Sequence, residues 1–199
     1  MIPTENIKEL RDKTGISVMQ CQKALQEAGG DMEKALFFLR KQSSVIAAKK
    51  SDRTLGAGLI QAYIHANCSI GAMVELNCET DFVAKNPEFK TLAYDIAMHT
   101  AAASPEYLAY KDIPESVKVE VGKMVDEEIA RDAGEKPDEI KIKMREGKLA
   151  AYFKEKTLLD QAFIKDPSMT IDALIKGFVQ KFGEKIEVGK FARLSVLGK

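Results

Sequence analysis

In residues 1–45, hydrophobic positions recur every three or four residues, which is the spacing of one face of an α-helix. Glycines divide this pattern into three short helices, the first of which we expect to start at a Thr4 cap and end at Gly15. Ser17 and Gln20 form a capping-box pair, in which the serine accepts the glutamine's amide and the glutamine side chain reaches back to the serine's amide. Helices this short are unstable alone, so they should pack into one module.

The second and third helices of this module have recognisable starts and buried sides. Asp31 is placed to cap the third helix, directly after a glycine pair that ends the second. Residues 46–55 are small, basic or polar, and we interpret them as a linker or a short helical extension. The buried side of the second helix is predicted to consist of Met19, Cys21, Ala24, Leu25 and Ala28.

From residue 56 the pattern is that of β-strands, rich in β-branched residues. Residues 56–66 and 69–78 are joined at Asn67, which predicts an antiparallel hairpin, and a third strand is predicted over 188–197. Helical patterns lie between the strands, and two of them, separated by the short segment DAGEKP, should form an antiparallel hairpin over about 114–156. The four predicted helices are 87–103, 114–131, 137–156 and 170–182.

These elements predict an α+β protein: a three-helix module followed by a core over residues 56–199 with a small three-stranded antiparallel sheet, flanking helices and a helical hairpin. The hairpin strands carry apolar residues on both faces, and one layer of helices covers only one face. A second sheet could cover the other face, which favours a homodimer. The two apolar faces are Ile60, Ala62 and Ile64 on one side, and Leu59 and Tyr63 on the other.

Composition and charge narrow the class of protein. Thirty basic residues balance thirty acidic ones, and only residues 47–53 form a short basic run, so we expect no direct nucleic-acid binding. The first residues lack the apolar stretch of a signal peptide, no segment is apolar enough to cross a membrane, and a cytoplasmic protein is expected. Cys21, Cys68 and Cys78 lie in predicted helix or strand and are interpreted as reduced core residues.

Candidate catalytic or metal-binding patterns are scarce. His65 and His99 have no ligand-spaced partner, so no metal site is predicted. Residues 183–191 (GEKIEVGKF) have the wrong glycine spacing for a phosphate loop, and Phe191 stands where a magnesium-binding hydroxyl is needed. We therefore predict neither a cofactor nor enzyme chemistry.

Phe82 lies where a predicted strand stops and a helix is ready to begin, beside Asp81. The ring either folds back over the sheet's edge, with Asp81 only capping a turn, or projects outward as a partner-binding wedge. The surrounding residues decide between these through a resemblance. ELNCETDFVAKN (residues 75–86) closely resembles the signature of bacterial-type elongation factor Ts, and residues 10–36 resemble its N-terminal module.

Residues 93–105 and 144–166 are similar to further segments of that family, in the same order. The three-helix module resembles the ubiquitin-associated fold, and the short chain resembles family members with a single core unit. The resemblance implies a translation elongation factor that binds GDP-bound elongation factor Tu, displaces Mg²⁺ and promotes GDP release so that GTP can rebind. It makes or breaks no covalent bond.

The same resemblance implies which residues touch the GTPase. Thr80, Asp81, Phe82 and Val83 would intrude beside its magnesium and phosphate site. The N-terminal module would add contacts through Arg11, Val18 and Met19, although Met19 also fits a core position, and His65 would lie near the partner. Two other classes remain open on the residues alone: an adaptor built on the three-helix module, and, third, an enzyme.

Overall fold

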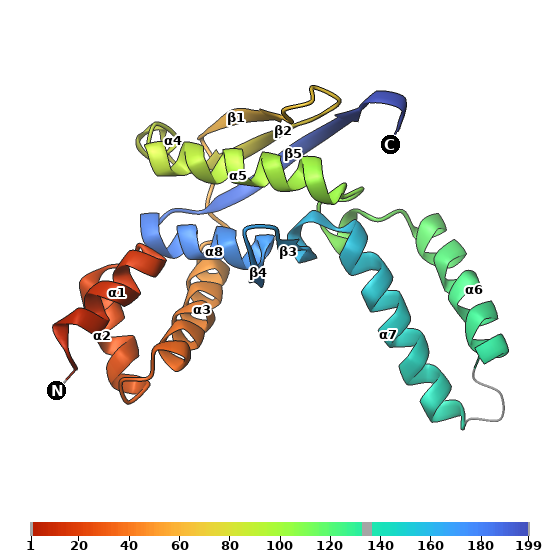
Figure 1. Cartoon of the computed structure of the whole chain (residues 1–199), viewed down its shortest axis with the longest axis horizontal. Helices are drawn as coiled ribbons and strands as arrows, with labels where there is room; N and C mark the ends of the chain where they lie inside the picture. The colour runs from red at the N-terminus through yellow and green to blue at the C-terminus, as the bar shows by residue number, and fades with distance from the viewer. Residues whose placement is uncertain (1, 133–136, 199) are drawn as a thin grey trace. The chain divides into compact units, whose positions relative to one another are not determined.

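The computed structural model describes residues 2–132 and 137–198. The chain forms two compact units, the first from Met1–Ala101 with Asp172–Lys199 and the second from Ala102–Ile171. Figure 1 labels the elements of both units. None of the described helices is long and apolar enough to cross a membrane.

A three-helix bundle opens the first unit, as predicted. It consists of α1 (Thr4–Thr14), α2 (Val18–Glu27) and α3 (Met32–Lys49). Because α3 continues to Lys49, the beginning of the segment 46–55 is a helical extension. The bundle buries a single apolar cluster composed of Leu10, Ile16, Cys21, Ala24, Leu25, Ala28, Ala35 and Leu39.

The ends of these helices follow the predicted signals in part. Gly15 ends α1 in the left-handed conformation, with φ 66°. Ser17 Oγ accepts the amide of Gln20 at 3.4 Å, but the Gln20 side chain meets the serine hydroxyl at 3.2 Å instead of the serine amide. The Thr4 prediction is wrong: Pro3 is the N-cap residue, and Thr4 already lies inside the helix.

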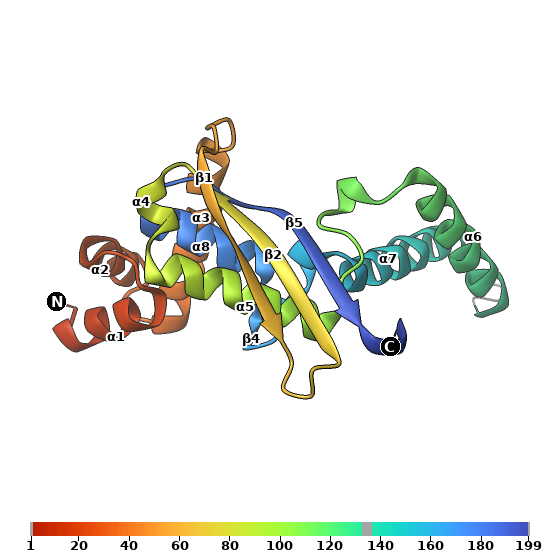
Figure 2. The same cartoon turned by 90° about the horizontal axis from the view of Figure 1, so that it is seen from above.

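The predicted three-stranded antiparallel sheet is present. Its strands are β1 (Ala57–Ile64), β2 (Ile70–Cys78) and β5 (Ile186–Ser195), in the order β1-β2-β5. Figure 2 shows β2 between its two neighbours. The four-residue helix α4 (Asp81–Ala84) follows β2 directly.

One face of the sheet is covered by α5 (Pro87–Ala103), and α8 (Ile171–Phe182) packs beside α5 (Figure 1). Ring contacts hold these layers together: Tyr63 on β1 meets Tyr94 on α5 at 5.6 Å between centroids, and Phe89 on α5 meets Phe182 on α8 at 6.4 Å. The opposite face of the sheet bears exposed apolar side chains. The two-faced pattern predicted for the first hairpin strand is therefore confirmed.

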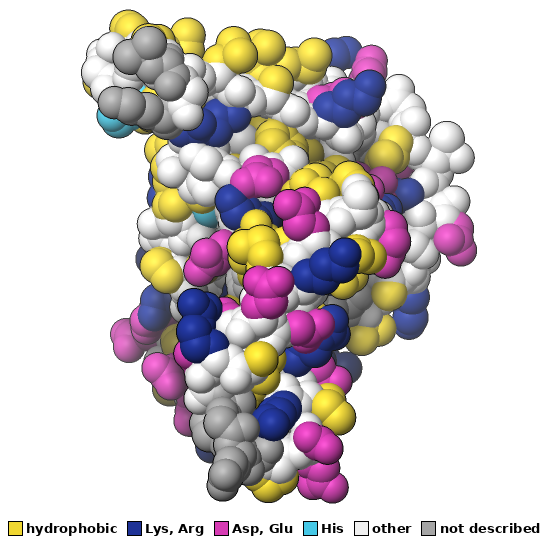
Figure 3. All heavy atoms as spheres, turned by 90° about the vertical axis from the view of Figure 1, so that its right-hand side faces the viewer, with side chains coloured by type: hydrophobic (Ala, Val, Ile, Leu, Met, Phe, Trp, Pro, Cys, Tyr) yellow, Lys and Arg dark blue, Asp and Glu magenta, His cyan; other side chains and the backbone are white. Residues whose placement is uncertain are grey.

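The second unit contains the predicted helical hairpin, α6 (Glu115–Asp132) and α7 (Asp138–Lys156). Arg145 on α7 donates to Asp126 on α6 at 2.6 Å, and Figure 3 shows acidic and basic side chains interspersed over this unit. The predicted turn between the helices falls mostly on residues 133–136, which lie outside the described residues.

Several short elements had no clear pattern in the sequence. The second unit contains a two-stranded sheet of β3 and β4. Because β3 has only two residues and β4 only five, neither strand is long enough for a clear alternation of hydrophobic and polar positions. These short elements are β3 (Ala162–Phe163), β4 (Asp166–Thr170), and the 3₁₀ turns Tyr110–Asp112, Leu158–Asp160 and Val196–Gly198.

Candidate partner-binding site

The candidate site is the corner between β2 and α4, residues 80–83, which we call the corner. Phe82 lies in the first turn of α4, and 85% of its surface is exposed. The ring therefore does not fold back over the sheet. Asp81 beside it is also exposed and pairs with Lys85 one turn later at 3.4 Å. The corner presents an apolar ring and a carboxylate together.

Val83 supports the corner from inside. Only 4% of its surface is exposed, so its side chain belongs to the core of the first unit. The backbone of α4 is closed by the amides of Ala84 and Lys85, which donate to the carbonyls of Thr80 and Asp81 at 3.2 and 3.0 Å. Of the predicted residues, Asp81 and Phe82 face outward and Val83 faces inward.

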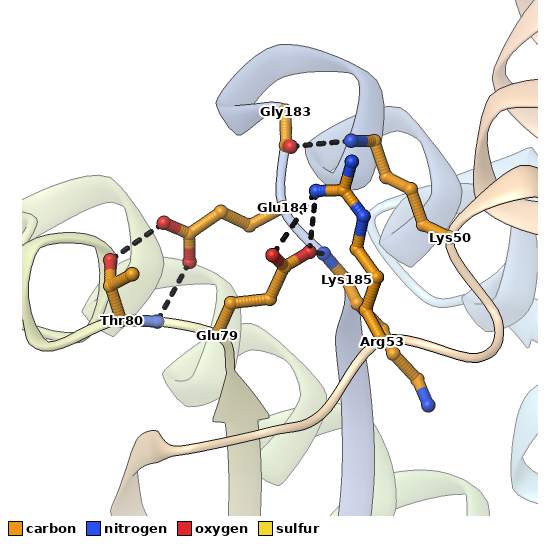
Figure 4. A network of polar contacts seen from close by, with 7 residues as sticks. All are labelled: Lys50, Arg53, Glu79, Thr80, Gly183, Glu184 and Lys185. Atoms are coloured by element: carbon orange, nitrogen blue, oxygen red, sulfur yellow. Dashed lines mark hydrogen bonds and ion pairs between the residues drawn. The ribbon is translucent and has the colours of Figure 1, made fainter.

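Thr80 is the N-cap residue of α4, but its side chain does not cap the helix. Its hydroxyl donates to Glu184 Oε1 at 2.6 Å, and its amide donates to Glu184 Oε2 at 3.0 Å (Figure 4). Glu184 lies in the turn between α8 and β5. The Glu184 carboxylate thus accepts hydrogen bonds from both donors of Thr80.

The preceding residue, Glu79, makes the matching contact in the other direction. Its Oε1 accepts the amide of Lys185 at 2.5 Å, and Oε2 pairs with Arg53 Nη1 at 3.1 Å (Figure 4). Partial burial pushes the pKa of Glu79 upward, but the hydrogen bonds from the Lys185 amide and Arg53 outweigh it and hold the pKa below its ordinary value. Glu79 is accordingly an anion at neutral pH.

The predicted residues of the N-terminal module lie on the bundle surface. Arg11 is exposed in the last turn of α1, and Val18 and Met19 are exposed in the first turn of α2. Met19 was also assigned to the buried side of α2, and this is wrong, because 81% of its surface is exposed. The inward positions of α2 begin instead at Cys21.

His65 lies just beyond the far end of β1 from the corner. Ala57, at the start of β1, pairs with Cys78 next to the corner, whereas Ile64 at its end pairs with Gly71. An eight-residue strand spans about 25 Å, so the structure does not bring His65 and Phe82 together. The Tyr63 hydroxyl lies 3.0 Å from His65 Nδ1.

Other candidate chemistry stays dispersed. Among the described residues, no group of three or more His, Cys, Asp or Glu side chains is arranged to hold a metal ion. His99 is buried in α5. The interpretation of all cysteines as core residues is wrong for Cys68, which is exposed in the turn after β1 because the strand ends before it, while Cys21 and Cys78 are buried.

The contacts of Glu79 and Glu184 were not predicted from the sequence. Residues 183–191 were considered only as a possible phosphate loop, and no sequence pattern singles out Glu184 within them. Thr80 and Glu184 are 104 residues apart, and no periodicity relates positions at such a separation. An acidic residue in the turn before a strand is the only local signal.

Known proteins resemble this chain over nearly its full length. A protein-family model described as Elongation factor TS matches residues 43–198. Elongation factor Ts of Carboxydothermus hydrogenoformans is 46% identical over 196 residues, covering 98% of this chain and 89% of the relative. The proteins of the same name from Thermosipho melanesiensis and Thermodesulfovibrio yellowstonii are 45% and 47% identical, each over 98% of this chain and over 99% and 96% of the relative.

Proposed function

Because this chain belongs to the elongation factor Ts family, we propose that it is a guanine-nucleotide exchange factor that acts on elongation factor Tu in the cytoplasm. The observation that carries the proposal is the exposed ring of Phe82 on a corner held in place by the core. A large exposed aromatic side chain on a fixed backbone is costly in water, and such side chains form the centres of many protein interfaces.

The exchange follows from thermodynamic linkage and requires no covalent chemistry. A protein that binds the nucleotide-free GTPase more tightly than the GDP-bound GTPase weakens GDP binding by the same factor. Phe82 inserts into the nucleotide domain, and Asp81 lies beside its magnesium site. Once Mg²⁺ is displaced, the negative charge of the diphosphate is poorly neutralised, so GDP leaves and GTP can bind.

The exposed bundle residues provide a second contact. Arg11, Val18 and Met19 lie within the end of α1 and the start of α2 and can be covered by one partner surface. His65 lies at the other end of β1 from the corner and would touch a different part of the GTPase. These contacts contribute affinity, whereas the corner acts on the nucleotide site.

Release of a fluorescent GDP from elongation factor Tu tests the proposal. The unmodified chain should accelerate release by orders of magnitude, and Phe82→Ala should lower that acceleration about 30-fold, the effect of losing one strong interface anchor. Phe37→Ala is the matched control, since Phe37 is also an exposed phenylalanine, on α3. An unmodified chain that leaves the release rate unchanged would contradict the exchange function.

We also propose that two copies associate through the uncovered face of the sheet. Its apolar side chains gather along the upper edge of Figure 3, on the side where the sheet lies in Figure 1. A groove of about 390 Å³ is lined by residues of β1, β2 and β5 and of the turn after β1. The same face on a second copy is complementary to it, because both are apolar and strands pack face to face about 10 Å apart. The exposed apolar residues are Ile60, Ile64, Met73, Leu194 and Val196.

A further inference from the structure

We propose that Glu184 is a positioning residue that sets the direction in which Phe82 projects, through a reciprocal clamp between residues 79–80 and 184–185. The inference deepens the proposed exchange function and rests on it. Glu184 is half-buried in the turn between α8 and β5 and is not itself expected to touch the partner.

The clamp is reciprocal in its hydrogen bonds. The Glu184 carboxylate accepts from the amide and hydroxyl of Thr80, at 3.0 and 2.6 Å. In return, the Glu79 carboxylate accepts from the amide of Lys185 at 2.5 Å. Two consecutive residues on one segment therefore bind two consecutive residues on the other, each by a side chain and a backbone amide. This pattern fixes both the separation and the direction of the two backbones.

Two further contacts bring in the segment that follows α3. Arg53 Nη1 pairs with Glu79 at 3.1 Å, and Lys50 Nζ donates to the carbonyl of Gly183 at 2.6 Å (Figure 4). The clamp thus joins three parts of the chain that are distant in sequence. Each contact is partly exposed and contributes little to global stability. Their combined effect is to restrict the backbone at the corner.

The corner needs this external support because α4 cannot hold itself. Starting a helix costs conformational entropy, and a helix of four residues forms too few backbone hydrogen bonds to offset that cost. Thr80 is the residue from which α4 starts, and Phe82 follows two positions later. Fixing both donors of Thr80 therefore fixes the start of the helix and the direction of the ring. A preorganised ring loses less conformational freedom on binding.

Two measurements on the full chain test the clamp. The first is hydrogen exchange of the Thr80 amide, followed by NMR without any partner. Glu184→Ala should accelerate it about tenfold or more, since the amide loses its acceptor. Glu184→Gln keeps an acceptor oxygen and should be intermediate. Glu187→Ala is the matched control, because Glu187 pairs with Lys185 Nζ at 3.2 Å and not with the corner. This substitution should leave the exchange rate of the Thr80 amide unchanged.

The second measurement is the acceleration of GDP release from elongation factor Tu. Glu184→Ala should lower it about tenfold, at an unchanged unfolding temperature, by misplacing the ring. In a Phe82→Ala background the same substitution should have almost no further effect, because a residue that acts only through Phe82 has nothing left to position. A merely structural role would lower the rate in both backgrounds.

The possible failures are distinguishable. If the unmodified chain does not accelerate release, the exchange function is wrong and the inference falls with it. If the unmodified chain accelerates GDP release, two outcomes would overturn only the positioning role. In the first, Glu184→Ala accelerates release as much as the unmodified chain does. In the second, Glu184→Ala lowers the acceleration by the same factor in the Phe82→Ala background as in the unmodified chain. Unchanged exchange of the Thr80 amide in Glu184→Ala would overturn the clamp itself.

Discussion

Phe82 and Val83 are adjacent in the chain, yet 85% of one side chain and 4% of the other are exposed. Successive residues of a helix point about 100° apart, so a single helical turn at the end of a strand can bury one neighbour and expose the next. At the residue scale, Val83 anchors the corner to the core while Phe82 remains available to a partner. Replacement of Val83 should therefore lower the stability of the folded chain, whereas replacement of Phe82 should weaken binding to the partner.

The cysteines give a second test at the residue scale. Burial raises the pKa of the Cys21 and Cys78 thiols, so these side chains are both shielded and protonated at neutral pH. Cys68 is exposed. We expect one thiol per folded chain to react rapidly with a chromogenic disulfide, and all three to react in denaturant.

Cys68→Ser is the control for this assignment. It should remove the rapid reaction and leave the slow one unchanged. Rapid reaction of two or three thiols in the folded chain would mean that the strands and helices around Cys21 or Cys78 open far more readily than their burial indicates.

At the scale of elements, the start of α3 provides a pH-dependent contribution. Asp31 Oδ1 accepts the amide of Lys34 at 3.0 Å, and chiefly this hydrogen bond lowers the pKa of Asp31 from its ordinary value of 3.8. A carboxyl whose pKa is lower in the folded chain stabilises it above the unfolded pKa. That stabilisation is lost as the pH falls through the folded pKa.

Thermal unfolding followed by circular dichroism measures this contribution. Between about pH 6 and about pH 3, Asp31→Asn should lose less stability than the unmodified chain, because asparagine accepts the same amide without titrating. Asp12→Asn, on the exposed surface of α1, is the control. An identical loss in the unmodified chain and in Asp31→Asn would show that the Asp31 carboxylate does not contribute.

Local signals predicted most elements well, and their failures have local causes. The helix predicted over residues 87–103 has the observed bounds, because Pro87 can begin a helix and an apolar stripe runs along its whole length. The start of α1 is one residue earlier than predicted, because Pro3 and the adjacent Thr4 offer two possible starts. The two residues of β3 are too few to show any period.

At the scale of the whole molecule, the uncovered sheet face determines the expected assembly. Met73 lies in the central strand with 51% of its surface exposed, so Met73→Asp places a charge in the middle of the proposed interface. A charge there is poorly solvated once two faces meet, and the association should weaken at least tenfold. Light scattering at micromolar concentration should give twice the 22.0 kDa of one chain for the unmodified protein and a lower mass for the variant.

Met124→Asp is the matched control, since this methionine is 58% exposed on α6, which is not part of the sheet. It should leave the measured mass unchanged. A mass of one chain for the unmodified protein at that concentration would refute the homodimer.

The sequence by itself determined the helices, the three main strands, the two apolar sheet faces and the resemblance of residues 75–86 to a known signature, because these depend on the spacing of neighbouring residues. Only the tertiary structure decided that Phe82 projects, that Met19 and Cys68 are exposed, and that Glu79 and Thr80 meet Lys185 and Glu184. The physical reason is range: periodicity reports which face of an element is apolar, whereas the exposure of one ring and the meeting of two distant turns depend on how the elements pack.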